Sequence, residues 1–300
     1  MATIQDITFL LVGLIAVFTL ATLSPASADE GPAIGSSIES VPVFDAHMHY
    51  KQPAWLAYPP STVIELMDKS GVAIALVSST PDEGTIRLWK FAPNRIVPEL
   101  RPYHGDAGSS NWTKAPGMAE YLRGRLAEYP HQGIGEFHIH NIDMSDEPLL
   151  REVAAMAKAG NIPVHVHSGA QPVHWLYRLE PELTVIWAHA GMTEPAAVVE
   201  ELMLKYPTLY ADTSYRETDI RGADGQIAAD WRHVIERFPQ RFMVGTDTWV
   251  NGQWDNYAGL ITLNREWLSR FPRRIAELIA YKNAERLFGR KVTQDLIGKR

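Results

Sequence analysis

Short apolar runs alternate with amphipathic stretches along the chain from residue 41 onward. Each apolar run is rich in β-branched or aromatic residues and is bounded by Gly, Pro, Asp or Ser, a pattern typical of buried strands. The predicted strands span residues 41–47, 72–78, 96–102, 133–137, 162–167, 184–189, 209–212 and 242–245. The stretches between them show the apolar period of helices that bury one face.

The helical patterns follow the predicted strands one for one. They span residues 62–69, 86–91, 118–129, 147–159, 173–179, 196–206, 226–238 and 257–270, and a last one spans 273–288 with Gly289 as its predicted C-cap. Eight strand–helix units in about 250 residues predict an α/β fold, a single (β/α)8 TIM barrel with an extra C-terminal helix. An open, doubly wound parallel sheet is the alternative.

The first 28 residues differ from this pattern. Residues 9–23 are uncharged and mostly apolar, and Ala26-Ser27-Ala28 follows a proline, which predicts a signal peptide cleaved after Ala28. The segment before the apolar run has no Lys or Arg, so an uncleaved membrane anchor and a misplaced start are the alternatives. We expect an exported protein, periplasmic or secreted, with a flexible leader at 29–40, the barrel at 41–290 and a C-terminal tail at 291–300.

Composition limits the chemistry that the chain can perform. The net charge of −7 and the lack of a basic run argue against a nucleic-acid partner. Because the chain has no cysteine, a thiolate can serve neither as nucleophile nor as metal ligand. The sequence also lacks the Gly-x-Ser-x-Gly elbow, the phosphate-binding loop, the His-Glu-x-x-His motif and a dinucleotide fingerprint.

Polar residues stand at the carboxyl ends of several predicted strands. His47 and His49 are two residues apart in an extended run, so their side chains point the same way and form half of a site for a divalent metal. Because the active sites of (β/α)8 barrels lie at the carboxyl ends of the strands, we expect the other polar residues at these ends to converge on them. These are Glu136, His167, His189 and Asp247.

Imidazole and carboxylate groups together predict a bound divalent metal. Zn²⁺ is the default ion for hydrolysis, and Mn²⁺, Fe²⁺ and Co²⁺ accept the same ligands. Such an ion lowers the pKa of a bound water to about 7. Asp247 can bind the ion and take a proton from that water, while His189 can bind the ion or act as acid or base.

The chain resembles the amidohydrolase superfamily, specifically its amidohydrolase-2 branch of metal-dependent TIM-barrel hydrolases. The order of the segments carries this resemblance more than the His-x-His pair alone does. The segments are Phe44-Asp45-Ala46-His47-Met48-His49, Gly135-Glu136, Pro163-Val164-His165-Val166-His167, Ala188-His189-Ala190-Gly191, Gly245-Thr246-Asp247 and Lys282-Asn283-Ala284-Glu285-Arg286-Leu287-Phe288-Gly289.

The resemblance implies a role for each ligand. A main metal would be held by His47, His49, His167 and Asp247. His189 would bind a second metal or serve as catalytic acid or base, and Glu136 would be a bridging or second-metal carboxylate, so one or two ions are expected. A buried carboxylate paired with a histidine or lysine is the alternative for Glu136.

The same resemblance implies the reaction. We expect a metal-dependent hydrolase that uses a metal-activated water to cleave an amide, ester or lactone bond in a small molecule. A metal-dependent decarboxylase of a small carboxylic acid is the first alternative, and a barrel that binds a metal or ligand without catalysis is the second. A homo-oligomer is compatible with the sequence.

Three further residues are candidates for substrate binding. Arg101 ends the third strand and Arg216 follows the seventh, so either guanidinium could bind a substrate carboxylate, with an ordinary ion pair as the alternative. Trp249 is one of several loop aromatics that could line an apolar or aromatic substrate, with packing in a lid as the alternative. Asp45, facing inward below His47, and His165 are expected to be supports rather than catalysts.

Overall fold

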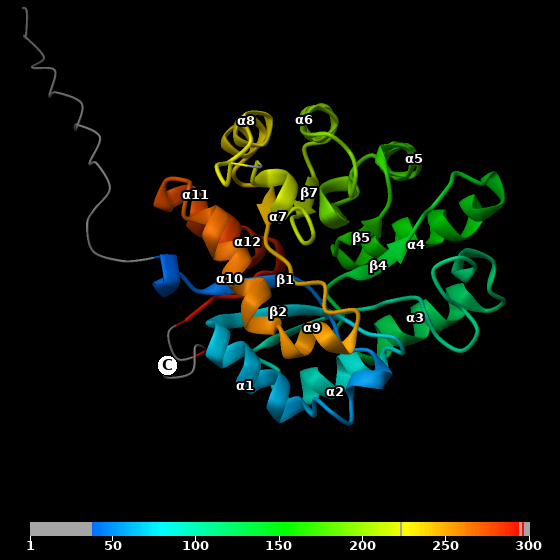
Figure 1. The fold of residues 1–300 in the computed structure, drawn as a ribbon. Coiled ribbons are helices and arrows are strands. Elements are labelled where there is room, and N and C mark those ends of the chain that lie inside the picture. Colours follow the sequence, from blue (N-terminus) through cyan, green and yellow to red (C-terminus); the bar gives the residue numbers. More distant parts are fainter. Residues whose placement is uncertain (1–37, 223, 294–295, 297–300) are drawn as a thin grey trace, which may run out of the picture. The chain divides into compact units, whose positions relative to one another are not determined.

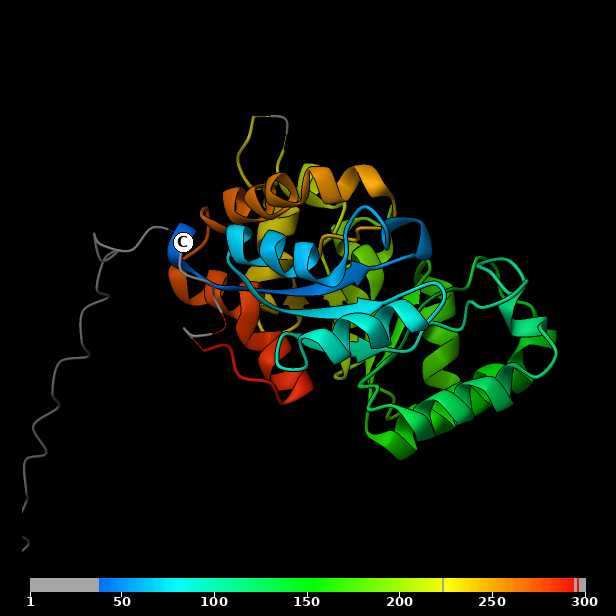
Figure 2. The same cartoon turned by 90° about the horizontal axis from the view of Figure 1, so that it is seen from below.

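The structure is a computed structural model that describes residues 38–222, 224–293 and 296. Within these residues, eight strands alternate with helices, and helices lie around the strands in both views (Figures 1 and 2). The strands are β1 (Val43–His49), β2 (Val72–Ser78), β3 (Ile96–Glu99), β4 (Ile134–His138), β5 (Val164–His167), β6 (Val185–Trp187), β7 (Leu209–Asp212) and β8 (Phe242–Met243).

Each predicted helical pattern corresponds to an observed helix or helical segment. The helices are α1 (Pro60–Ser70), α2 (Glu83–Phe91), α3 (Met118–Glu128), α4 (Glu147–Gly160), α5 (Ala170–Leu179), α6 (Ala196–Lys205), α7 (Glu217–Ile220), α8 (Ala229–Arg237), α9 (Asn251–Asp255), α10 (Tyr257–Leu268), α11 (Arg273–Glu277) and α12 (Asn283–Phe288). Gly289 caps α12 with a φ of 61°, as predicted. The short helices α7 and α9 were not predicted, because four or five residues carry no full apolar period.

The strands are parallel and follow one another in sequence order. Ladders join β1-β2-β3 and β4-β5-β6-β7-β8. A parallel bridge between Leu100 and Ile134 links the end of β3 to β4, and the Ala46 N–H donates to Val244 O at 2.9 Å, which links β1 to the end of β8. Because β1 therefore has β2 on one side and the β8 segment on the other, the structure is a TIM barrel and not the open sheet.

Apolar residues fill the space between strands and helices. Every residue of β1 and β2 is buried. Phe44 of β1 stacks on Phe288 of α12 with ring centroids 5.7 Å apart, so the C-terminal helix closes over the amino end of the first strand. This burial leaves the polar ends of the strands as the place where functional groups gather.

The strand ends differ from the prediction at two places that matter for the site. β1 ends at His49, so both histidines of the His-x-His pair belong to the strand. β6 ends at Trp187, and His189 lies in the tight turn Ala188–Gly191 that follows. The predicted signal peptide lies outside the described residues, and none of the described helices is long and apolar enough to cross a membrane.

Candidate active site

The six side chains predicted to bind metal lie together at the carboxyl ends of the strands. They are His47 and His49 of β1, Glu136 of β4, His167 of β5, His189 in the turn after β6 and Asp247 after β8. They come from segments up to 200 residues apart in the sequence, since 247 − 47 = 200. All except His167, which is partly exposed, are buried.

One half of this cluster joins β1 to the loop after β8. The Nε2 atoms of His47 and His49 are 3.2 Å apart. Asp247 Oδ1 lies 3.1 Å from His49 Nε2 and 3.6 Å from His47 Nε2. Two imidazole nitrogens and a carboxylate oxygen so close together form a ligand set for a divalent cation.

The other half joins β4, β5 and the turn after β6. Glu136 Oε1 lies 2.8 Å from His167 Nδ1 and 3.5 Å from His189 Nε2, and these two nitrogens are 3.2 Å apart. Glu136 also reaches the first half, because its Oε2 is 3.3 Å from His49 Nε2. The structure therefore places His167 beside Glu136 and His189, and Glu136 stands between the two halves.

Hydrogen bonds on the far side of three of the rings determine which nitrogen faces the cluster. With its proton on Nδ1, His49 donates to Ser78 O at 2.8 Å, and His189 donates to Ser214 O at 3.1 Å. His47 Nδ1 lies 3.2 Å from Asp212 Oδ2 and donates to it in the same way. Because the Nδ1 of these three rings is used in this manner, their Nε2 atoms face the cluster and are the atoms that a metal would bind.

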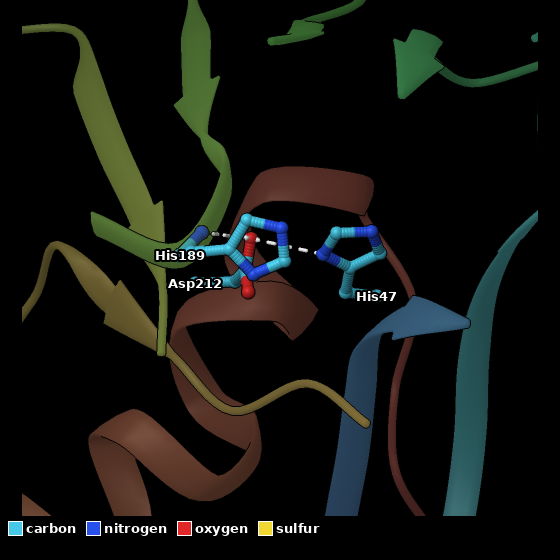
Figure 3. Close-up of side chains that lie close together, drawn as sticks. All are labelled: His47, His189 and Asp212. Carbon is cyan, nitrogen blue, oxygen red and sulfur yellow. Dashed lines mark hydrogen bonds and ion pairs between the residues drawn. The ribbon is translucent and has the colours of Figure 1, made fainter. Parts of the chain in front are cut away.

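Asp212, the last residue of β7, holds two of these histidines from below (Figure 3). Its Oδ2 accepts from His47 Nδ1, from the His189 backbone N–H and from His165 Nε2, at 3.2, 3.2 and 3.1 Å. Its Oδ1 accepts from the backbone N–H of Ser214 at 3.0 Å and from the Ser214 hydroxyl. Since a carboxylate offers about four acceptor positions, none remains for a metal.

A second buried carboxylate continues this support. His165 lies between Asp212 and Glu99, whose Oε2 is 3.2 Å from His165 Nδ1. Burial disfavours the charged form of His165, but the carboxylates of Glu99 and Asp212 outweigh it and raise its pKa to about 9. The expected supporting role of His165 is therefore confirmed, with Glu99 and Asp212 as its partners.

Two glycines allow the strands to bring these side chains so close. Gly135 has a φ of +152°, and a Cβ there would lie 2.6 Å from the Cβ of His165. A Cβ on Gly245 would lie 2.6 Å from the Cβ of His47. Only glycine fits at either position, and each one precedes a candidate ligand by one or two residues.

Two candidate site residues have strained backbone conformations. His189 has φ 55° and ψ 26°, and Asp247 has φ 46°, both in the left-handed region that non-glycine residues rarely adopt. Such conformations cost about 1–3 kcal/mol each and persist only where the surroundings impose them. The Asp247 N–H donates to His47 O at 2.7 Å, which ties its strained backbone to β1.

The carboxylates of the cluster are held in the ionised form. Burial alone raises the pKa of Asp247, but His47 and His49 outweigh it and bring that pKa to about 2. Glu136 has a pKa well below its usual value, because His47, His167 and His189 outweigh the effect of its burial. Both groups are therefore anionic at neutral pH, which is the state that binds a cation.

The structure corrects the predicted direction of Asp45. The register between β1 and β2 shifts between Asp45 and Met48, so Asp45 and His47 no longer share a face. Asp45 accepts from the Thr246 hydroxyl at 2.7 Å and from the Tyr257 hydroxyl of α10 at 2.9 Å. Asp45 is a support, as expected, but it anchors the loop after β8 to α10 and does not lie below His47.

A cavity of about 600 Å³ opens above the cluster. Glu136, Asp247 and several of the histidines lie in its wall. The remaining lining residues are Lys51, Thr80, Arg101, Tyr103, Ala107, Gly108, Ser109, His138, Met192, Tyr215 and Trp249. The cavity is large enough for a small organic molecule and combines aromatic walls with a polar floor.

Of the predicted substrate-binding residues, Trp249 and Arg101 line this cavity. Trp249 is half exposed and donates from Nε1 to the Tyr215 hydroxyl at 2.9 Å. Arg101 is buried, and its guanidinium donates to Glu136 Oε2 at 2.8 Å and to Glu136 O at 2.9 Å. Arg101 therefore already has the ion pair that the sequence left open as its alternative.

Arg216 does not line the main cavity. It donates to Glu194 O at 2.7 Å, pairs with Asp219 at 2.9 Å and stacks on Trp231, beside a separate cavity of about 420 Å³. The preceding residue, Tyr215, has a φ of 61°, and it lines the main cavity where Arg216 was expected. The left-handed residue turns the chain at this point, so Tyr215 and not Arg216 lines the main cavity, and Arg216 has the ion pair that was its alternative.

Sequence reasoning overlooked Asp212 and Lys51. Asp212 ends the predicted seventh strand, so the rule that selected the other strand ends applies to it equally. Lys51 lies two residues beyond His49 and lines the cavity. No sequence pattern indicated Ser214, since its contact with His47 and His189 depends on how the chain turns after β7.

The TIM barrel and its cluster of imidazoles and carboxylates define a metal-dependent hydrolase. The family model described as amidohydrolase matches residues 45–290, so the chain belongs to the amidohydrolase family. This family is the one that the sequence segments indicated. A search of curated proteins found no match.

Solved structures with the same fold include a lactonase, a probable hydrolase and a TatD homologue. A lactonase from Listeria monocytogenes has a TM-score of 0.60 and 14% identity, with 85% of this chain and 97% of that chain covered. A probable 2-pyrone-4,6-dicarboxylic acid hydrolase from Acinetobacter baumannii has a TM-score of 0.57 and 14% identity, with 82% and 99% covered. A TatD homologue from Escherichia coli has a TM-score of 0.56 and 17% identity, with 82% and 98% covered.

These similarities establish the fold and, with the family match, the class of enzyme. Identities of 14–17% are too low to transfer a substrate. Together with the family match, the comparisons do not favour the decarboxylase alternative.

Proposed function

We propose that the protein hydrolyses an ester, lactone or amide bond of a small molecule, with a divalent ion held by His47, His49, Glu136, His167, His189 and Asp247. The observation that carries the proposal is the convergence of these six groups, five of which line the cavity. Zinc is the ion that imidazole and carboxylate ligands favour for hydrolysis, and the ligand set also suits Mn²⁺, Fe²⁺ and Co²⁺.

The donor chemistry fits such an ion, with room for one or two. Three histidines turn Nε2 towards the cluster, and two carboxylates are ionised and close by. When bound, a divalent ion supplies Lewis acidity that lowers the pKa of water to about 7 and polarises a carbonyl oxygen. Glu136 lies between both halves of the cluster, which supports a bridging role.

Asp247 is the proposed acid–base residue. Its Oδ1 faces His49, and its Oδ2 is 3.8 Å from His189 Nε2, so the carboxylate borders the space above both histidines. As an anion it can take a proton from the attacking water and pass it to the leaving group. Because His189 Nδ1 is directed at Ser214 O, its Nε2 is the nitrogen that faces the cluster, which supports a ligand role for His189.

A substrate screen with controlled metal content tests this proposal. The purified protein is stripped with chelator, reloaded with Zn²⁺, Mn²⁺ or Co²⁺, and assayed on esters, lactones and amides with simultaneous detection of CO₂. We expect hydrolysis that disappears on stripping and returns on reloading. Release of CO₂ without a hydrolysed product would support the decarboxylase instead, and metal binding without any turnover would support a non-catalytic barrel.

Export of the protein is proposed from the N-terminal sequence alone. The apolar run at residues 9–23 and the small residues around Ala28 support a cleaved signal peptide. Expression of the full chain in a bacterial host, fractionation and N-terminal sequencing test it. A periplasmic product that begins at Asp29 is expected, and an intact N-terminus in the membrane fraction would identify an uncleaved anchor.

A further inference from the structure

Two cationic side chains line the main cavity, and their surroundings differ. Arg101 is buried and bound to Glu136 at 2.8 Å. Lys51 is half-buried, and among the residues that the structure describes its side chain has neither an ion pair nor a hydrogen bond. Its Nζ lies 5.8 Å from the centroid of the Trp249 ring.

The two anionic groups of the cavity are already engaged. Glu136 is bound by Arg101 and His167, and Asp247 lies against His49 and His47. Neither is within ion-pair distance of Lys51 in the described part of the chain. Lys51 is therefore the cavity cation whose charge remains available to a molecule that enters.

The wall around Lys51 suits a flat, partly polar molecule. Trp249 and Tyr215 are joined by a hydrogen bond of 2.9 Å, which holds the indole at the mouth of the cavity. Tyr103 lies under the guanidinium of Arg101, with 4.6 Å between the guanidinium carbon and the ring centroid. Aromatic faces beside an unpaired ammonium group favour a planar or cyclic anion over an aliphatic neutral molecule.

We propose that Lys51 binds a carboxylate of the substrate that is remote from the bond being cleaved, while Trp249 covers the adjacent part of that molecule. The substrate class is then a small cyclic or aromatic ester, lactone or amide that carries a carboxylate. This inference rests on the proposed function for the reaction, but the binding of the anion can be tested without turnover. Lys51 acts here as a specificity-determining residue, and the chemistry at the cluster does not depend on its charge.

Isothermal titration of the metal-loaded protein with benzoate and with benzamide tests the inference directly. The two probes have the same shape and differ in charge. We expect the wild type to bind benzoate at least about tenfold more tightly than benzamide, as one partly buried charge pair contributes. Lys51→Gln should lose this preference, and Lys51→Arg should retain most of it.

A matched lysine provides the control. Lys205 also lies over an aromatic ring, 5.4 Å from the centroid of Tyr206, but it is exposed and does not line the cavity. Lys205→Gln makes the same change in net charge and should bind both probes like the wild type. A wild type without preference for benzoate, or a preference that survives Lys51→Gln, would overturn the inference.

A kinetic comparison separates failure of the inference from failure of the proposed function. The probes are 4-acetoxybenzoate and its neutral amide, 4-acetoxybenzamide. If both are hydrolysed equally well by the wild type and by Lys51→Gln, the hydrolase stands and the role of Lys51 falls. If neither is hydrolysed while the titration still shows the charge preference, the role of Lys51 stands and the reaction must be sought among other bonds.

Discussion

Two groups of side chains share His47 and His189, and they differ in whether their carboxylates are free to bind a metal. The upper group adds Asp247 and Glu136 to these histidines, and the lower group adds Asp212 and His165. Above the rings, Asp247 and Glu136 face the Nε2 atoms at the floor of the cavity. Below them, in the lower group, Asp212 faces His47 Nδ1 and accepts five hydrogen bonds from the protein, of which Figure 3 shows those from His47 and His189. The comparison teaches that proximity of ligand types does not make a metal site, because the carboxylate must also have free lone pairs and an open approach.

Replacement of Asp247 by Asn should cause the largest loss of activity. The amide cannot take a proton from water, and removal of a general base costs about 10²–10⁴-fold in rate. The variant should still fold, since the Asp247 backbone N–H still donates to His47 O. Measurements of kcat and of thermal unfolding check this, with the exposed Asp230→Asn of α8 as the control. An active Asp247→Asn variant would remove this residue from the mechanism.

Replacement of Asp212 by Asn should act through metal affinity and stability, because Asp212 takes no direct part in the reaction. It leaves the cavity unchanged but weakens the hydrogen bonds that orient His47 and His165. We expect metal affinity to fall about 10–100-fold, as for other groups that orient a metal-binding histidine. We also expect a lower melting temperature, because Asp212 is fully buried. Competition with a chelator measures the affinity, and an unchanged affinity would mean that the lower group does not position the upper one.

Glu136→Gln distinguishes one ion from two. The neutral amide binds a divalent ion poorly, and it also loses the ion pair with Arg101. If Glu136 bridges two ions, elemental analysis should show the stoichiometry falling from two towards one per chain. Unchanged stoichiometry would indicate that Glu136 serves only to hold Arg101 and His167 in place.

The proton on His165 in the lower group should also make the free energy of unfolding depend on pH, and this effect should be smaller than the ones above. His165 has a pKa of about 9 against an ordinary value of 6.5, so the folded state holds its proton more tightly than the unfolded chain does. Its contribution is therefore complete below pH 6.5 and is lost as the pH rises through 9. It is on the order of 1–3 kcal/mol.

Urea unfolding of the metal-free protein checks this pH dependence. The wild type should lose more free energy of unfolding than His165→Gln does between pH 6.5 and pH 9. The variant retains His47 and the other titrating groups, so the difference isolates His165. Equal losses in the two proteins would contradict a protonated His165.

The sequence predicted most of the barrel and the upper group, and the reasons are physical. Long apolar strands and amphipathic helices have clear periods, and His47, His49 and Asp247 stand where parallel strands end. Features that depend on local backbone geometry were not predictable. The bulge in β1 turned Asp45 away from the site, and the left-handed Tyr215 moved Arg216 out of the cavity. No period or spacing encodes either feature.

The lower group was missed for a different reason. Asp212 ends a strand like the other site residues, but its importance comes from the number of donors that converge on it. Such a network joins β1, β5, β7 and the turn after β6, so it appears only when the strands are placed side by side. Binding of the substrate anion by Lys51 likewise depends on the absence of a partner in the described structure, which a sequence does not reveal.

Elemental analysis of the purified wild type and of the His47→Ala/His49→Ala double variant tests the central claim most directly. The account predicts one or two equivalents of divalent metal per wild-type chain. It predicts a lower metal content in the double variant, because the first half of the site has lost its two imidazoles. Circular dichroism confirms that the variant is folded. A wild type that stays free of metal after incubation with Zn²⁺, Mn²⁺ or Co²⁺, or a folded variant with undiminished metal content, would contradict it.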